Sequence, residues 1–219
     1  MAVLVGAAAA DEYVLGDWNL PDTVSMRVPT NPGGYQPGSL GTYFDVVFRD
    51  IPDVDPPYDI KNQRYPGWCI ETDVFITPGT WYDDAAVTST IDANPINWKA
   101  INYLVNHRTG YHWKTVQAAI WHYAGSTGGD FNAYRSAYPD AYDALIADVD
   151  GNYEDWVPAY DSVVVGAVKV DAGSNVQTLI IELERPWTLV PEFPTLAVPV
   201  GLLIGVVYTV SVIRGRKPE

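Results

Sequence analysis

The sequence has little cysteine, histidine and positive charge. Its 219 residues include one cysteine, Cys69, so no internal disulfide can form. There are 13 Lys and Arg against 27 Asp and Glu, giving a formal net charge of −14. Such an acidic chain repels phosphate backbones, and we expect no nucleic-acid partner. No zinc-ligand spacing, phosphate-binding loop or dinucleotide fingerprint is present, and we expect no metal and no cofactor.

Aromatic and turn-forming residues, by contrast, are plentiful. The chain carries 15 Tyr, 8 Trp, 17 Pro and 18 Gly, a composition that favours strands and long loops over a helix bundle. Hydrophobic residues make up 47% and charged residues 18%, which is typical of a folded protein. The length suits one core-forming domain with short targeting segments.

The N-terminus has the pattern of a processed leader. Residues 3–10 are apolar, and Ala8 and Ala10 form a small-x-small motif just before Asp11. This predicts that residues 1–10 are the end of a secretory signal peptide and that the folded domain spans residues 11–190. The alternative is a first buried strand.

The C-terminus predicts a membrane anchor. Thr195 to Ile213 contains no charged residue, and as a helix it has about the length of the ~30 Å bilayer core. Arg214, Arg216 and Lys217 follow at once. By the positive-inside rule this basic end stays in the cytoplasm, so we expect a transmembrane helix over 195–213 and an extracellular main domain.

A short motif precedes this span. Pro191, Glu192 and Phe193, followed by the apolar stretch and the basic end, resemble the PEF-type sorting signals of archaeal surface proteins over residues 191–219. The resemblance implies that a membrane-embedded archaeosortase removes the tail and passes the protein to a lipid. A plain transmembrane anchor is the alternative, and both place the protein on the cell surface.

Periodicity within 11–190 predicts strands, then helices, then strands. Asn97 is a plausible N-cap, Pro139 a helix start and Gly125 a helix end. This order indicates an α+β fold, a β-sandwich or barrel with a helical insertion at about 97–150. Strands are predicted over 24–28, 42–48, 68–76, 162–170 and 176–184, and helices over 98–107, 112–124 and 140–149.

One polar residue interrupts the apolar stripe of the second helix. Trp113, Val116, Ile120 and Ala124 follow helical spacing, and Gln117 lies among them. A glutamine facing a core is costly unless it is hydrogen-bonded. A buried glutamine bonded to backbone is one reading of this position.

The surrounding sequence favours a second reading. The segments Tyr-Pro-Gly-Trp-Cys-Ile-Glu (65–71), Asn-Trp-Lys-Ala-Ile-Asn-Tyr-Leu-Val-Asn (97–106) and Val-Gln-Ala-Ala-Ile-Trp (116–121) resemble the thioester domains of bacterial surface adhesins. The resemblance covers about 65–124. It implies that Cys69 supplies the thiol and Gln117 the acyl group of an internal thioester, with Val116 where the family often has Thr. It also implies an adhesin that a partner amine attacks, giving covalent attachment.

Neighbouring residues are candidates to support this chemistry. Trp68, Trp113 and Trp121 flank the pair in the sequence and would shield a thioester from water. His112 and His122 are candidate proton shuttles, although each also fits a helix-surface histidine.

Three further hypotheses remain open. A cysteine hydrolase would use Cys69 as nucleophile and one of His107, His112 and His122 as base. A structural envelope subunit, of a sheath or surface layer, would use Cys69 only as a small buried hydrophobe. Residues 148–155 have acidic spacing reminiscent of a calcium loop but lack the glycine and final Glu of an EF-hand, which favours an acidic turn.

Overall fold

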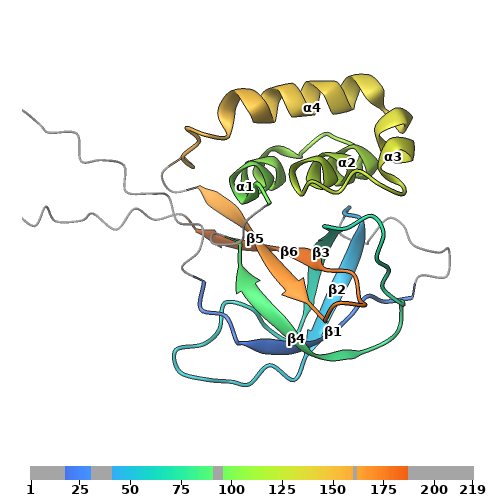
Figure 1. The fold of residues 1–219 in the computed structure, drawn as a ribbon. Coiled ribbons are helices and arrows are strands. Elements are labelled where there is room, and N and C mark those ends of the chain that lie inside the picture. Colours follow the sequence, from blue (N-terminus) through green and yellow to red (C-terminus); the bar gives the residue numbers. More distant parts are fainter. Residues whose placement is uncertain (1–17, 31–40, 91–95, 160–161, 187–219) are drawn as a thin grey trace, which may run out of the picture.

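The computed structural model describes residues 18–30, 41–90, 96–159 and 162–186. Within these ranges, six antiparallel strands close into a barrel in the order β1-β2-β3-β6-β5-β4 (Figure 1). The strands are β1 Thr23–Arg27, β2 Phe44–Arg49, β3 Arg64–Cys69, β4 Tyr82–Ser89, β5 Val163–Asp171 and β6 Leu179–Pro186. Alternating apolar residues such as Val24, Met26 and Val46 fill the core.

Four helices form a layer on one side of the barrel, with α4 farthest from it (Figure 1). They are α1 Trp98–His107, α2 Trp113–Tyr123, α3 Phe131–Ala137 and α4 Pro139–Asn152. The Asn97 side chain accepts a hydrogen bond from the Ala100 N–H, which confirms the predicted N-cap. The left-handed φ of +72° at Gly125 follows the end of α2, also as predicted.

The predicted α+β, barrel-like class is confirmed, and the closed ring of strands decides between sandwich and barrel. The strand predicted over 68–76 is wrong, because β3 ends at Cys69. Beyond it the Ile70 N–H still donates to the Thr178 carbonyl at 3.2 Å, but the Thr72 N–H donates to a side chain, Ser126 Oγ, at 2.9 Å. Pairing with β2 instead extends the strand back to Arg64.

The predicted signal peptide (1–10), sorting motif (191–193) and membrane span (195–213) lie outside the described residues. Among the helices of the described ranges, none combines the length and the apolar character that crossing a bilayer requires.

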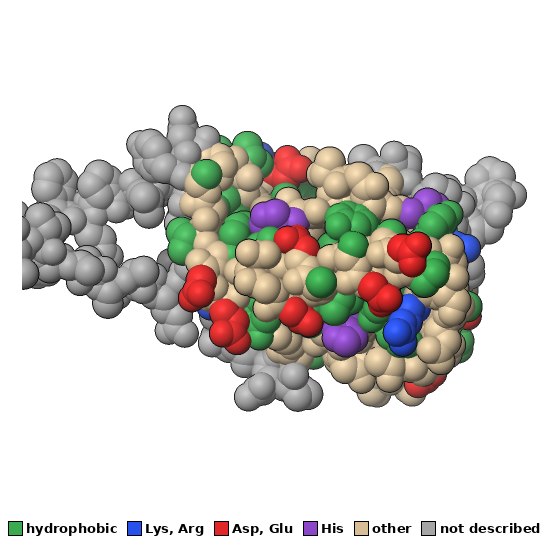
Figure 2. Space-filling view, turned by 90° about the horizontal axis from the view of Figure 1, so that it is seen from above, with side chains coloured by type: hydrophobic (Ala, Val, Ile, Leu, Met, Phe, Trp, Pro, Cys, Tyr) green, Lys and Arg blue, Asp and Glu red, His purple; other side chains and the backbone are tan. Residues whose placement is uncertain are grey.

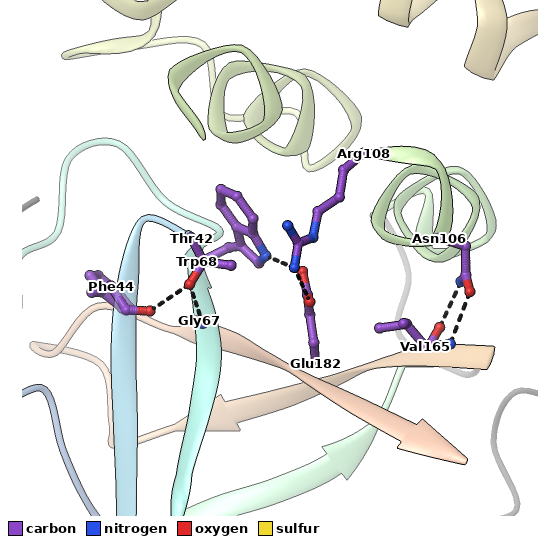
Figure 3. Close-up of polar contacts among 8 residues, drawn as sticks. All are labelled: Thr42, Phe44, Gly67, Trp68, Asn106, Arg108, Val165 and Glu182. Atoms are coloured by element: carbon purple, nitrogen blue, oxygen red, sulfur yellow. Dashed lines mark hydrogen bonds and ion pairs between the residues drawn. The ribbon is translucent and has the colours of Figure 1, made fainter. Parts of the chain in front are cut away.

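Side-chain amides fasten the helices to the barrel. The amide of Asn106 on α1 donates to the Val165 carbonyl at 2.7 Å and accepts from the Val165 N–H at 2.9 Å (Figure 3). The neighbouring Asn102 accepts from the Ala167 N–H at 2.8 Å. Each amide completes backbone hydrogen bonds that β5 leaves open, so α1 has a defined position on the barrel.

Gly67→Ala is expected to destabilise the fold by about 1–3 kcal/mol, the usual cost of overpacking. A Cβ at Gly67 would lie 2.6 Å from Val46 Cγ2 and 3.2 Å from the Phe44 carbonyl oxygen, and backbone cannot move aside cheaply. Gly151→Ala is the control, since a Cβ there meets nothing within 4 Å. Urea unfolding of both variants measures the difference. Equal midpoints would contradict the close packing of β2 against β3 at Gly67.

Candidate functional site

Cys69 and Gln117, 48 residues apart, meet in the core between the barrel and the helical layer. The Cys69 N–H donates to Gln117 Oε1 at 3.0 Å, and Gln117 Nε2 donates to the Cys69 carbonyl at 2.8 Å. Both residues are fully buried, at 0% exposure. The structure therefore brings the predicted pair together, with the carboxamide of Gln117 held against the backbone of the cysteine.

Two elements position this pair. Cys69 is the last residue of β3, where pairing with Leu179 of β6 fixes the backbone. Gln117 lies in the middle of α2, a helix that is buried from Thr115 to Trp121 because the barrel lies on one side and other helices on the other. This all-round burial explains why a polar side chain on α2 needs a polar partner.

Four aromatic residues adjoin the pair, and we call them the aromatic lid: Tyr43, Trp113, Trp121 and Tyr134. The Tyr43 ring lies 5.8 Å from Trp113, 6.2 Å from Trp121 and 6.0 Å from Tyr134, between centroids. Tyr134 in turn lies 5.4 Å from Trp113 and 5.3 Å from Trp121. Burial raises the pKa of both tyrosine hydroxyls, and the nearby Cys69 adds to both shifts. The lid thus combines two predicted tryptophans with two tyrosines.

The lid is tied to the cysteine segment. Trp121 Nε1 donates to the carbonyl of Glu71 at 3.2 Å, two residues beyond Cys69. Trp121 is almost completely buried, whereas Tyr43, Trp113 and Tyr134 are half-buried. The lid therefore has an inner part in the core and an outer part that solvent reaches.

Burial raises the pKa of the Cys69 thiol well above its ordinary value, and the carboxylate of Glu71 adds to the shift. In a Gln117→Met variant, where no thioester can form, we expect native alkylation to be slower than alkylation in urea. The rate should fall about tenfold for each unit by which the pKa is raised. It should still be rising at pH 10, where an ordinary thiol of pKa about 8.5 has reached its plateau.

The same shift has a consequence for stability. The folded protein holds the thiol proton more tightly than the unfolded chain does, so the protonated thiol contributes to the free energy of unfolding. This contribution is present below the pKa of the unfolded chain and is lost as pH rises through the pKa of the folded protein. Iodoacetamide rates from pH 7 to 10, followed by mass, test the shift. A rate in the folded variant that has its midpoint near pH 8.5 and levels off by pH 10 would refute it.

Trp68 has a different position from the other predicted shielding residues. Its Nε1 donates to Glu182 Oε1 at 2.7 Å, and Glu182 Oε2 pairs with Arg108 at 2.7 Å (Figure 3). Trp68 is fully buried and Glu182 almost so. Trp68, Glu182 and Arg108 thus link β3, β6 and the end of α1, and Trp68 is the residue directly before Cys69.

The three histidines have contacts elsewhere. His107 Nδ1 lies 2.8 Å from the Tyr103 carbonyl, and His112 caps α2 by accepting from the Lys114 N–H. His122 is exposed, and its Nδ1 lies 3.2 Å from the Tyr142 hydroxyl on α4. These are the three bases of the hydrolase hypothesis, and His122 is also the predicted support residue. The contacts described for all three are with residues other than Cys69.

The acidic segment 148–155 begins inside a helix. Asp148 and Asp150 belong to α4, which continues to Asn152, so the expected acidic turn starts later than predicted. Their carboxylates accept hydrogen bonds from Tyr103 and Tyr123. In the described ranges, no group of three or more candidate ligands has the arrangement of a metal site.

Tyr43 and Tyr134 were not predicted. Tyr43 directly precedes β2, and Tyr134 lies on α3, a helix that periodicity did not indicate. Only the packing of α3 against α2 brings Tyr134 to the pair. Comparisons with known protein families, with curated proteins and with solved structures found no match, so the site stands on its own geometry.

Proposed function

We propose that Cys69 and Gln117 form an internal thioester and that the amine of a partner molecule opens it, which attaches the protein covalently. The observation that carries this proposal is the fully buried pairing of the Gln117 carboxamide with the Cys69 backbone. The chemistry needs a thiol and an amide carbonyl held together, because amides are poor acyl donors in free solution.

Thioester formation is written as follows. The Sγ of Cys69 attacks Cδ of Gln117, the Cδ–Nε2 bond breaks, and ammonia leaves with the thiol proton. The Cys69 N–H already donates to Oε1, the atom on which negative charge develops. The Cys69 carbonyl holds the Nε2 that departs. One backbone residue thus orients both ends of the carboxamide.

The amine of a partner then opens the thioester, with the sulfur of Cys69 as the leaving group. An amine nitrogen attacks Cδ of Gln117, the Sγ–Cδ bond breaks, and the thiol of Cys69 recovers a proton. The high thiol pKa favours the protonated product. Burial of the pair and the aromatic lid keep water away, which matters because hydrolysis competes with the partner.

The proposal includes a cell-surface role as an adhesin. It is supported by the predicted signal peptide at 1–10 and the predicted sorting signal and membrane span at 191–219. An extracellular setting also agrees with this chemistry, because oxidants reach exported proteins and an unpaired cysteine that is held in a thioester is not open to oxidation. The partner is a surface molecule that presents an amine.

The test is the intact mass of the purified protein beside a Cys69→Ala variant. We expect the parent alone to be lighter than its calculated mass by one ammonia, and to gain one methylamine after incubation with that amine. Alkylation before and after methylamine should detect a thiol only afterwards. Full mass with a thiol that alkylates once the protein is unfolded would refute the proposal.

A second candidate is a structural envelope protein, and one observation favours it. Asn106 makes the same two-way amide pairing with the Val165 backbone that Gln117 makes with Cys69. Under this hypothesis, Gln117 only holds α2 to β3 through hydrogen bonds, and Cys69 is an unreactive buried side chain. Under this function the parent keeps its full mass and methylamine adds nothing.

A further inference from the structure

The outer part of the aromatic lid already holds a positive charge. Lys114 Nζ lies 5.4 Å from the ring centroid of Trp113 and 5.4 Å from that of Tyr134. Both distances fall within the range of about 6 Å in which an ammonium is attracted to an aromatic face. Tyr134 and Trp113 are half-buried, so their rings are partly screened from water.

The surroundings favour a cation as well. Burial raises the pKa of Tyr43 and Tyr134, and the carboxylate of Asp130, directly before α3, adds to both shifts, which indicates a negative charge near the two hydroxyls. The helical layer presents more Asp and Glu than Lys and Arg side chains on the face in Figure 2, with Asp140, Asp143 and Asp150 exposed on α4. A net charge of −14 attracts cations toward this surface.

We propose that the outer aromatic lid, formed by Tyr43, Trp113 and Tyr134, is a binding site for an alkylammonium group, which Lys114 occupies in the unbound protein. The reactive part of this inference rests on the proposed thioester, whereas the binding part does not. The lid would select charged primary amines over neutral nucleophiles, and Lys114 would compete with them.

The reaction then balances as follows. The bound ammonium gives one proton to solvent, its nitrogen attacks Cδ of Gln117, and the Sγ–Cδ bond breaks. A second proton passes from nitrogen to the Cys69 sulfur, and the third stays on the new amide.

Tetramethylammonium tests the binding site, since it carries the charge but cannot react. We expect saturable quenching of tryptophan fluorescence in the full-length Cys69→Ala protein, and none with the neutral isostere tert-butyl alcohol. Lys114→Gln should tighten binding about two- to fivefold, the value of one exposed cation–π contact. The control Lys99→Gln makes the same charge change on α1 and should leave the affinity unaltered.

Tyr134→Leu removes one π face and should weaken binding. Because this change also alters the packing of α3, Asp130→Asn serves as a second variant that keeps the Tyr134 ring. We expect Asp130→Asn to bind tetramethylammonium more weakly than the parent at low salt, and we expect the difference to vanish at high salt, which screens the Asp130 charge. Equal affinity for the neutral isostere, or no response to Lys114→Gln, would overturn the proposal.

In the parent protein, tetramethylammonium should slow methylamine capture competitively. Nα-acetyl-lysine amide and glucosamine present the same ammonium on a protein-like and a sugar-like carrier, and the larger second-order rate constant identifies the carrier. Binding of tetramethylammonium without any amine adduct would support the ammonium site and refute the thioester. Adduct formation that tetramethylammonium does not slow would overturn the site and leave the thioester standing.

Discussion

Gln117→Glu is expected to abolish amine capture and to make stability strongly dependent on pH. A carboxyl group has no ammonia to lose, so the variant should have its full calculated mass and gain no methylamine. The change preserves the size of the side chain and the acceptor for the Cys69 N–H, which lies 3.0 Å from Oε1. The loss of function would therefore follow from the leaving group and not from a cavity.

The stability effect follows from the second contact. Gln117 Nε2 donates to the Cys69 carbonyl at 2.8 Å, and an ionised carboxylate at the same position would place two acceptors together at 0% exposure. The carboxyl must be protonated to donate, so its pKa rises above the ordinary value of about 4.3. Stability is then retained below that value and lost as pH rises through the folded pKa. We expect a loss of about 3–5 kcal/mol at neutral pH, the cost of an uncompensated buried charge.

Gln177→Glu is the matched control. Gln177 is also buried and its Nε2 donates to the Glu71 carbonyl at 2.7 Å, but it is not the predicted acyl donor. It should show a similar loss of stability with rising pH, while the mass deficit and methylamine capture persist at pH values where it is folded. Urea unfolding at pH 5 and pH 8, with intact mass on the same samples, provides both readouts. Methylamine capture by folded Gln117→Glu would contradict the assignment of the acyl donor.

Glu182→Leu is expected to cost about 3–5 kcal/mol, because it removes one partner from a buried charged group. The carboxylate is 4% exposed and accepts from Trp68 Nε1 at 2.7 Å while pairing with Arg108 at 2.7 Å. Without it, a buried indole N–H and a guanidinium that is 25% exposed both lose their partner.

Two comparisons make this prediction specific. Adding Arg108→Met to Glu182→Leu should recover part of the loss, since the unpaired charge is then gone. Lys169→Gln breaks the Lys169–Asp171 pair, whose side chains are 29% and 34% exposed, and should cost under about 1 kcal/mol. Thermal or urea unfolding measures all the variants. A loss as small for Glu182→Leu as for Lys169→Gln would show that the buried group does not hold the barrel to α1.

Local signals made several elements predictable. Asn97, Gly125 and Pro139 mark helix ends through capping and backbone geometry, which need no distant partner. Strand β4, Tyr82–Ser89, carried no such signal, because Asp83 and Asp84 interrupt its apolar alternation. Its strand character comes from pairing with β1 and β5 on its two sides, which close the barrel. The boundaries of β3 were likewise set by its partners rather than by its own residues.

The residue types of the site were readable along the chain, and its geometry was not. A Gln117 set in an apolar helical stripe indicated that this side chain needs a polar partner, because a polar group on a core-facing helix is costly without one. Its pairing with Cys69 was implied only by the resemblance of the surrounding segments to thioester domains. That the partner is the backbone of Cys69, that Glu182 binds Trp68 and Arg108, and that Tyr43 and Tyr134 complete the lid depended on contacts between distant segments. Such contacts arise only when the closed barrel and the helical layer bury the same residues together, so the tertiary structure alone decided them.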